Sequence, residues 1–485
     1  MLTKIKGKYR SLPVPVKASL WFLFCSFLQR GISVITTPIF TRLLTTSEYG
    51  QYGVFTSWLG IASAIVTLNL CYGMYSQGLI KFEKDRERFS SSLQGLALVL
   101  VSAWTLIYVL GKDVINQLTG LTTAQSLLLL VMVWTSTVFN FWATAKRVNY
   151  DYRLLVVVTV AVSLLKPILG VALVVWADDK VTARIFGLAL VELVGFGWMF
   201  FVQMKSGRTF FSRQYWKYAL LFCIPLLPHY LSQVILSSVN RIMIAGMAGD
   251  AQAGLYNLAN SIAMLLTLLN TALVQTIEPW MFRAIKARDI GRMKKVAYPA
   301  LMLVAGANLL LIAFAPEAVA LFAPAEYREA IWVIPPISIS VFFMFSYVLY
   351  AEFEFYFEKT KYITIATMVG SCLNVGLNLL LIPVFGYLAA GYVTLLCYMV
   401  FAALHFVMMR KISLVEFGTL PYAPRVLLGI SLVFTVAGLL YLPLYDHMIL
   451  RYGVTLLALA VLLIRRKAVM RNLKTIVSTK KDKSS

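Results

Sequence analysis

The segment FCSFLQRGISVITTPIFTRLL, residues 24–44, decides the class of this protein. It belongs to a long apolar run, and that run carries Arg30 near its middle. A bilayer-spanning helix needs roughly 20 apolar residues, and the run over residues 18–40 meets that length. An arginine at the centre of such a helix costs about 2.5–3.5 kcal/mol on insertion scales. The segment therefore predicts a membrane helix in which one cation has a specific role.

The composition of the whole chain also indicates a membrane protein. Of its 485 residues, 60% are hydrophobic and 13% are charged, whereas soluble domains carry about 25% charged residues. The mean hydropathy is +0.78. The net charge of +23 comes from short basic clusters between apolar runs. Such clusters are typical of cytoplasmic loops, and they do not form the basic face of a nucleic-acid-binding protein.

The cysteines give no sign of a disulfide framework or a metal site. The chain has 5 cysteines, all within apolar runs, and it contains no CxxC motif or Cys/His cluster. Cysteines in this setting behave as small, buried apolar residues. We expect neither a metal nor a cofactor.

Apolar runs of spanning length recur along the chain and predict an all-α integral membrane protein with fourteen spans. They cover residues 18–40, 51–76, 93–110, 121–144, 154–176, 184–204, 218–240, 253–278, 296–315, 330–353, 362–382, 387–409, 426–444 and 446–464. With the N-terminus inside, 35 of the 44 Lys and Arg residues fall on the cytoplasmic side and seven on the other. Because cytoplasmic loops are enriched in Lys and Arg, we expect both termini to be cytoplasmic.

A weak internal repeat predicts two parallel halves. Gly50 and Tyr52 recur as Gly254 and Tyr256, an offset of 204 residues, and this spacing equals six predicted spans. Parallel halves are a known plan of membrane transporters. We expect an N-terminal six-helix lobe, a C-terminal six-helix lobe, two extra helices and a basic cytoplasmic tail, at residues 1–215, 216–412, 413–465 and 466–485 respectively.

Polar residues form stripes on several predicted spans. Ser26, Arg30, Ser33 and Thr37 follow helical spacing in the first span. The seventh span carries His229 and Gln233, and the eighth carries Asn257, Gln275 and Glu278. Hydrogen bonding between helices explains any one such residue, and a packed, hydrogen-bonded role is the alternative for His229. Together the stripes favour a water-filled cavity between the halves.

Two basic residues, Arg30 and Lys166, lie inside predicted spans. A charge at this depth needs an anion, a carboxylate partner or water. One hypothesis is a salt bridge to Glu192 or Glu278, carboxylates that could also serve in ion coupling. The other is a cationic surface for an anionic substrate, since the planar guanidinium of arginine binds phosphate through two hydrogen bonds. Arg42 and Arg241 sit near the external ends of spans, where charged tips commonly extend to the headgroups.

Two segments resemble a known family of transporters. PIFTRLLTTSEYGQYGVF, residues 38–55, resembles the first-loop signature of polysaccharide-export flippases, and LNVGLNLLLIPVFGYLAAGYVTLLCY, residues 373–398, resembles their eleventh and twelfth spans. The resemblance is to Wzx-type lipid-linked oligosaccharide flippases. Their superfamily also holds the multidrug and toxin extruders and the lipid II flippase.

That resemblance implies a V-shaped pair of six-helix bundles around a central cavity in the bacterial plasma membrane. The implied cargo is an undecaprenyl-diphosphate-linked oligosaccharide repeat unit, turned over by alternating access for O-antigen, capsule or exopolysaccharide synthesis. It also implies a polysaccharide polymerase and a chain-length regulator as partners. In relatives, cationic cavity residues bind the diphosphate or acidic sugars, and Arg30 and then Lys166 fit that role best here.

Two other functions stay open on the sequence. A multidrug exporter of the same superfamily would use a carboxylate in its first spans, whereas the first span here has Arg30 and no acid. A membrane glycosyltransferase or polymerase would need acidic residues or a large external loop. The only external acidic pair is Asp178 and Asp179 in a short turn, so we do not expect an enzyme.

Overall fold

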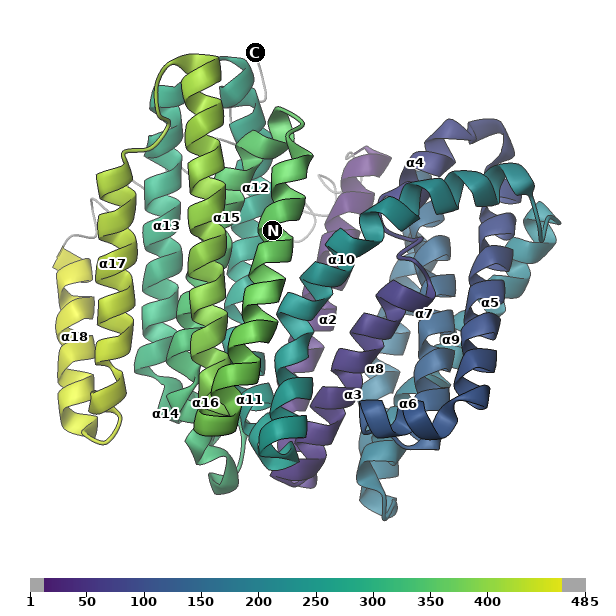
Figure 1. Ribbon diagram of the computed structural model, residues 1–485, viewed down its shortest axis with the longest axis horizontal. Coiled ribbons are helices and arrows are strands. Elements are labelled where there is room, and N and C mark those ends of the chain that lie inside the picture. The colour runs from purple at the N-terminus through teal and green to yellow at the C-terminus, as the bar shows by residue number, and fades with distance from the viewer. Residues whose placement is uncertain (1–12, 465–485) are drawn as a thin grey trace, which may run out of the picture. The chain divides into compact units, whose positions relative to one another are not determined.

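The computed structural model describes residues 13–464, and throughout this range the chain is helical and contains no strand (Figure 1). Eleven of the described helices are long and apolar enough to cross a membrane by length and composition. The predicted all-α membrane fold is therefore confirmed. The chain divides into two compact units, one ending at Ile242 and the other beginning at Met243.

The N-terminal unit is built from the helices up to most of α10. They are α2 (Val14–Leu43), α3 (Thr46–Val66), α4 (Met74–Lys81), η1 (Glu83–Asp85), α5 (Arg86–Leu110), α6 (Lys112–Thr119), α7 (Thr123–Val148), α8 (Tyr152–Trp176), α9 (Lys180–Gly207) and α10 (Arg213–Ala248). The lobe boundary expected at residue 215 lies at the start of α10, whereas the division between the units falls near the end of this helix.

The C-terminal unit comprises the remaining elements. They are α11 (Asp250–Ala263), α12 (Leu266–Lys286), α13 (Ile290–Ala313), α14 (Ala315–Phe322), η2 (Ala325–Trp332), α15 (Ile334–Tyr356), α16 (Thr360–Phe417), α17 (Pro424–Leu440), η3 (Leu442–Leu444) and α18 (Met448–Ile464). The expected extra helices correspond to α17 and α18. The expected tail at 466–485 lies outside the described residues.

Fourteen spans are expected, whereas eleven described helices are long and apolar enough to cross a membrane. The difference arises in three places. The second and fourteenth spans correspond to α3 and α18, which are not among the eleven. The eleventh and twelfth spans both lie in α16, whose 58 residues are interrupted by non-helical geometry at Gly386. A straight helix of that length would extend about 87 Å, nearly three times the hydrocarbon core of a bilayer. The number fourteen and the cytoplasmic placement of the termini stay predictions.

The order of helices repeats between the two units. Helix α5 begins at Arg86 and α13 at Ile290, and each is followed by a short helix of 8 residues, α6 or α14. Gly187 and Gly391 are also 204 residues apart, and each allows close packing in its unit. A Cβ at Gly187 would lie 3.4 Å from the Gly170 Cα, and one at Gly391 would lie 2.2 Å from Val333 Cγ2. The repeated order is what two copies of one helical unit produce.

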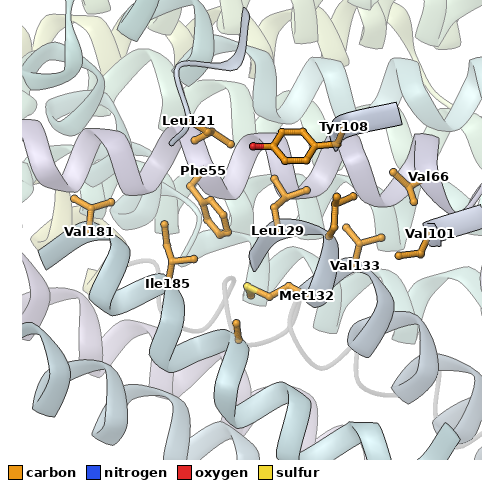
Figure 2. Packing of buried hydrophobic residues seen from close by; sticks show 12 residues of the cluster. Phe55, Val66, Val101, Tyr108, Leu121, Leu129, Met132, Val133, Val181 and Ile185 are labelled. Atoms are coloured by element: carbon orange, nitrogen blue, oxygen red, sulfur yellow. The ribbon is translucent and has the colours of Figure 1, made fainter. Parts of the chain in front are cut away.

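The core of the N-terminal unit contains residues of α3, α5, α7 and α9. Phe55, Val133 and Ile185, from α3, α7 and α9, are fully buried in one cluster (Figure 2). Lipid tails are as apolar as these side chains, so helices in a membrane are held together by close packing rather than by exclusion of water. This cluster gives α7 and α9 the fixed positions from which their polar residues extend.

In the C-terminal unit, α15 is the central helix. Of the residues in its most apolar stretch, 83% are buried, and it packs against α16, α13, α12, α11 and α17. Helix α18 is held by Glu317 of α14, which pairs with Arg451 and accepts a 2.6 Å hydrogen bond from the Tyr452 hydroxyl. The serines and the two glutamates of α15, Glu352 and Glu354, are all buried.

Candidate functional site

The signature segment at residues 38–55 forms the connection between α2 and α3. Thr45 caps α3: its side chain accepts a hydrogen bond from the Glu48 backbone N–H, and the Glu48 carboxylate accepts one from the Thr45 N–H at 2.8 Å. This reciprocal capping box satisfies backbone donors at the helix start. The Thr and Glu of the motif therefore fix where the second helix begins.

The aromatic residues of the same segment enclose Arg184 of α9. Its guanidinium carbon lies 3.6 Å from the centroid of the Phe40 ring and 3.5 Å from that of Tyr52. Arg184 is 8% exposed, and a cation stacked on aromatic faces in a dry site is stabilised by about 2 kcal/mol or more. The sequence did not mark Arg184 as special, because it stands at the edge of a span. It joins the ends of α2, α3 and α9.

Most of the polar stripe of α2 is exposed on the surface of the helix. Ser26, Arg30 and Ser33 are exposed, and Thr37 is buried. The hydroxyls of Ser26 and Thr37 donate to the backbone carbonyls of Phe22 and Ser33. Only 11% of the most apolar stretch of α2 is buried, while the helix packs against α8. The structure thus leaves the middle of this stripe, with Arg30, accessible on the helix surface.

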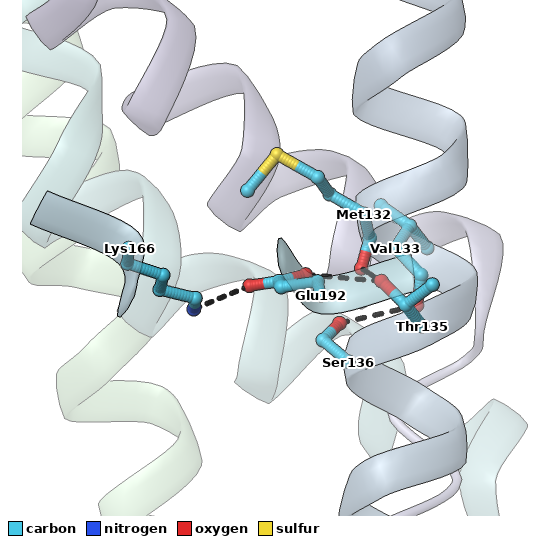
Figure 3. A network of polar contacts seen from close by, with 6 residues as sticks. All are labelled: Met132, Val133, Thr135, Ser136, Lys166 and Glu192. Atoms are coloured by element: carbon cyan, nitrogen blue, oxygen red, sulfur yellow. Dashed lines mark hydrogen bonds and ion pairs between the residues drawn. The ribbon is translucent and has the colours of Figure 1, made fainter. Parts of the chain in front are cut away.

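Lys166 of α8 lies beside Glu192 of α9, with 2.6 Å between Nζ and Oε1 (Figure 3). The other carboxylate oxygen accepts a 3.0 Å hydrogen bond from the Thr135 hydroxyl of α7. The Lys166 side chain is 29% exposed and that of Glu192 is 8% exposed. The carboxylate is therefore satisfied on both oxygens, and the ammonium group keeps access to the surface. Glu192 is one of the two salt-bridge partners that the sequence offered for Lys166.

Arg42 and Arg241 lie toward the ends of their helices. The guanidinium of Arg42 donates a 2.8 Å hydrogen bond to the Pro38 carbonyl in the last turn of α2, an arrangement that suits a cation near the C-terminal end of a helix. Arg241 is half-buried near the end of α10. Neither residue lies in the middle of its span.

In α10, the structure brings together His229 and Gln233. Their Nε2 atoms are 3.2 Å apart, and the neighbouring Tyr230 packs edge-on against Tyr72 at 5.0 Å between centroids. His229 is half-buried and Gln233 is exposed. The pair lies in the N-terminal unit together with Arg30 and Lys166.

Asn257, Gln275 and Glu278 belong to the C-terminal unit. Asn257 is buried in α11, and its carbonyl accepts a 2.7 Å hydrogen bond from Ser261. Gln275 and Glu278 are exposed on α12. Because α11 ends at Ala263 and α12 begins at Leu266, the expected stripe is divided between two helices. Among the described residues, no group of three or more His, Cys, Asp or Glu could hold a metal ion.

One buried ionic pair was missed at the sequence level. Glu354 of α15 and His405 of α16 are 2.7 Å apart, and their side chains are 0% and 1% exposed. Glu354 stands one residue beyond the span expected at 330–353, so local hydropathy places it in a loop. His405 could have been found, since it is a lone histidine in the apolar run CYMVFAALHFVMM.

Comparison with protein families decides the membership of the chain. A family model described as polysaccharide biosynthesis protein matches residues 16–285, which is more than half of the chain and includes Arg30, Lys166 and the signature segment. The chain belongs to this polysaccharide biosynthesis family. The resemblance expected from the sequence is thereby confirmed.

This family member is also similar to a curated bacterial protein. The Lsg locus putative protein 1 of Haemophilus influenzae is 20% identical over 370 residues, which cover 74% of this chain and 89% of that protein.

Solved structures share its fold. An inward-facing multidrug resistance MATE family transporter of the MOP superfamily has a TM-score of 0.61 at 15% identity, covering 80% of this chain and 95% of the other. The lipid II flippase MurJ, in an inward closed conformation, has a TM-score of 0.62 at 13% identity, covering 88% and 99%. The family member is thus a multi-pass integral membrane protein that shares the fold of these solved structures.

Proposed function

We propose that the protein is a flippase that moves undecaprenyl-diphosphate-linked oligosaccharide repeat units from the cytoplasmic to the outer face of the bacterial plasma membrane. The units would serve surface polysaccharide synthesis. The observation that carries this proposal is the exposed Arg30, with Ser26 and Ser33, on an apolar helix within the family-matched segment. A cation and hydroxyls in such a helix suit an anionic, hydroxyl-rich headgroup.

The chemistry of the cargo explains why a protein is needed. The hydrocarbon core is about 30 Å thick, and each polar group that enters it without a partner costs several kcal/mol. A diphosphate with several sugars cannot cross that distance alone. A guanidinium binds phosphate oxygens in a fork geometry, while the prenyl chain needs no partner because lipid already solvates it.

In the proposed mechanism, the headgroup exchanges its water for side chains of the protein and is released on the other side by alternating access. Arg30 and Lys166 would bind the diphosphate. The other predicted contacts for phosphate or sugar are Arg42, Arg241, His229, Gln233, Asn257 and Gln275. Glu192 and Glu278 remain candidates for ion coupling. Membrane lipids surround the protein, and we propose a polysaccharide polymerase and a chain-length regulator as functional partners.

A cation-coupled multidrug exporter is the second candidate. The fold does not separate the two functions, because the similarity to a MATE transporter and to MurJ is nearly equal, with TM-scores of 0.61 and 0.62. The sign of the charge in α2 does favour an anionic cargo, since cationic drugs would be repelled by Arg30. Transport of a cationic dye that does not change in Arg30→Gln would support the multidrug exporter instead.

Reconstitution tests the flippase directly. The purified chain is placed in vesicles with a fluorescent prenyl-diphosphate oligosaccharide, and transfer of the headgroup between leaflets is measured. We expect Arg30→Gln to lower the rate about tenfold or more, because a charge-assisted hydrogen bond contributes about 1.5–3 kcal/mol.

The matched control is Arg425→Gln, which removes an exposed cation at the start of α17 and is expected to transport at the wild-type rate. The proposal is wrong if the wild type moves no labelled lipid under any ion gradient. Equal rates for the wild type and Arg30→Gln would remove Arg30 from the site.

A further inference from the structure

The pair formed by Glu354 and His405 lies deep in the C-terminal unit, outside the residues assigned above to the substrate. Glu354 Oε1 is 2.7 Å from His405 Nδ1. The second carboxylate oxygen, Oε2, and the second ring nitrogen, Nε2, have no hydrogen-bond partner within the described part of the chain. Buried polar atoms are normally satisfied, so two such atoms in one ionic pair need an explanation.

Aromatic rings enclose the pair. Tyr347 of α15 stacks on the imidazole with 5.4 Å between centroids, and Phe401 packs edge-on at 4.5 Å. Phe401 and His405 are one helical turn apart in α16. The immediate surroundings are thus aromatic and the pair is buried, so a net charge there would be strongly unfavourable.

The other ionisable groups nearby are mostly neutral tyrosines. Tyr398 of α16 is buried beside Phe401, with 6.5 Å between the ring centroids. Glu352 is also buried, but it is two residues from Glu354, so its side chain leaves α15 on a different side.

Cations and further tyrosines of the packed elements lie elsewhere. The rings of Tyr298 of α13 and Tyr350 of α15 each lie 6.3 Å from that of Tyr422, and Arg425 of α17 is exposed. In α16, Arg410 and Lys411 are also exposed. Among the described residues, His405 is the one ion-pair partner that the structure gives Glu354.

We propose that Glu354 and His405 form a proton-binding site, and that its proton leaves only when this part of the C-terminal unit opens to water, which couples proton release to transport. The inference rests on the transport function proposed above. Intramembrane carboxylate and histidine groups commonly form proton relays, and nothing in the proposed substrate contacts requires this pair.

The coupling follows from the charge states of the site. With one proton shared between carboxylate and imidazole, the pair is neutral overall. Release of that proton leaves one negative charge among aromatic rings, and the cost of this charge falls only when water enters. A protonated pair therefore favours the closed arrangement and a deprotonated pair the open one, so the proton shifts the conformational equilibrium by its differential affinity.

Proton binding can be measured without any substrate. The chain has 3 histidines, so nitrogen NMR of a histidine-labelled sample gives few side-chain signals, and His405→Gln assigns the relevant one. We expect the nitrogen signals of His405 to change with pH. Glu354→Gln should alter this pH dependence, because the imidazole then loses the carboxylate that lies 2.7 Å from its Nδ1.

The control variant is Glu352→Gln, a buried acid of the same helix without a histidine partner, and it should leave the pH dependence of the His405 signals unchanged. The proposal is overturned if the His405 signals do not change with pH, or if they change equally in the wild type and in Glu354→Gln. Because a purely structural pair would also respond to the loss of the carboxylate, coupling to transport needs a second experiment.

Coupling is then tested in vesicles that carry the labelled prenyl-diphosphate oligosaccharide and a pH gradient. The wild type and Glu352→Gln should respond to the gradient, whereas Glu354→Gln should transport at a rate that no longer depends on it. A gradient response of Glu354→Gln equal to the wild type would refute the coupling. If the wild type moves no lipid at all, the flippase proposal fails, and the NMR titration still decides whether the proton site exists.

Discussion

At the residue scale, the Lys166–Glu192 pair raises the question of what a charged pair contributes inside a membrane protein. Glu192 is 8% exposed, and its partner is close at 2.6 Å. A buried pair adds little stability over apolar residues of the same size, but removing one partner leaves a buried charge and costs about 3–5 kcal/mol. The pair therefore allows the structural role of Lys166 to be separated from a substrate-binding role.

We predict that Lys166→Met lowers the melting temperature of the purified protein, because Glu192 loses its cation. The double variant Lys166→Met/Glu192→Met should melt close to the wild type, since no unpaired charge remains. If Lys166 also binds the diphosphate, the double variant should be stable and yet transport slowly in the vesicle assay.

The control for this series is Thr135→Val, which removes only the hydroxyl that donates to Glu192 and should have a smaller effect than Lys166→Met. A double variant that is as unstable as Lys166→Met would contradict the stranded-charge explanation. A stable double variant with wild-type transport would show that the pair is structural only.

The sequence predicts charged residues of interest where they interrupt an apolar run, and not where their burial depends on packing. Lys166 is conspicuous because it is a cation in the middle of such a run. Arg184 stands at the edge of a run, and the rings of Phe40 and Tyr52 enclose it only because three helices pack together. Glu354 is similar, since its burial at the end of α15 is set by α16 and not by local hydropathy.

At the scale of elements, hydropathy predicted the apolar helices and not their breaks. A run of apolar residues marks the part of the chain that lies in the bilayer, and backbone geometry within the run depends on single residues. The break between α11 and α12 falls inside one expected span. The 8-residue helices α6 and α14 are too short to give a periodic signal, and they lay in expected loops or span ends.

Gly386 is the residue at which α16 changes direction. Its φ of 59° and ψ of −145° lie in a region open essentially to glycine alone. A Cβ there would lie 2.2 Å from Gln252 Oε1, the atom that accepts a 3.0 Å hydrogen bond from the Tyr387 N–H. Both the backbone and this cap therefore require glycine.

We predict that Gly386→Ala destabilises the protein by about 1–3 kcal/mol and lowers the melting temperature measured in detergent. The matched control is Gly376→Ala in the same helix, where no heavy atom lies within 4 Å of an added Cβ. That variant should melt at or above the wild-type temperature, because alanine favours the helical state. Equal melting of the two variants would show that the turn does not depend on Gly386.

At the scale of the whole molecule, the repeated helix order and the distribution of charge lead to the same topology. Two copies of a unit with an even number of spans keep the same orientation in the membrane. The predicted spans place 35 basic residues on the cytoplasmic side and seven on the other side. This asymmetry would disappear if one span in the first half were miscounted, since the later basic clusters would change sides. The turn at Gly386 matters here, because it decides whether α16 crosses once or twice.

Cysteine labelling tests this topology in intact cells. In a chain without its native cysteines, Asp178→Cys and Asp446→Cys should react with a membrane-impermeant maleimide from outside, whereas Lys84→Cys and Thr419→Cys should react only after permeabilisation. All four positions are exposed. If α16 crossed the membrane once, every position after it would change sides, so Thr419→Cys would be labelled from outside and Asp446→Cys would not. Labelling of Lys84→Cys from outside would instead show that the predicted placement of the first two spans is wrong. The side of the membrane from which Arg30 meets its substrate would then be wrong as well.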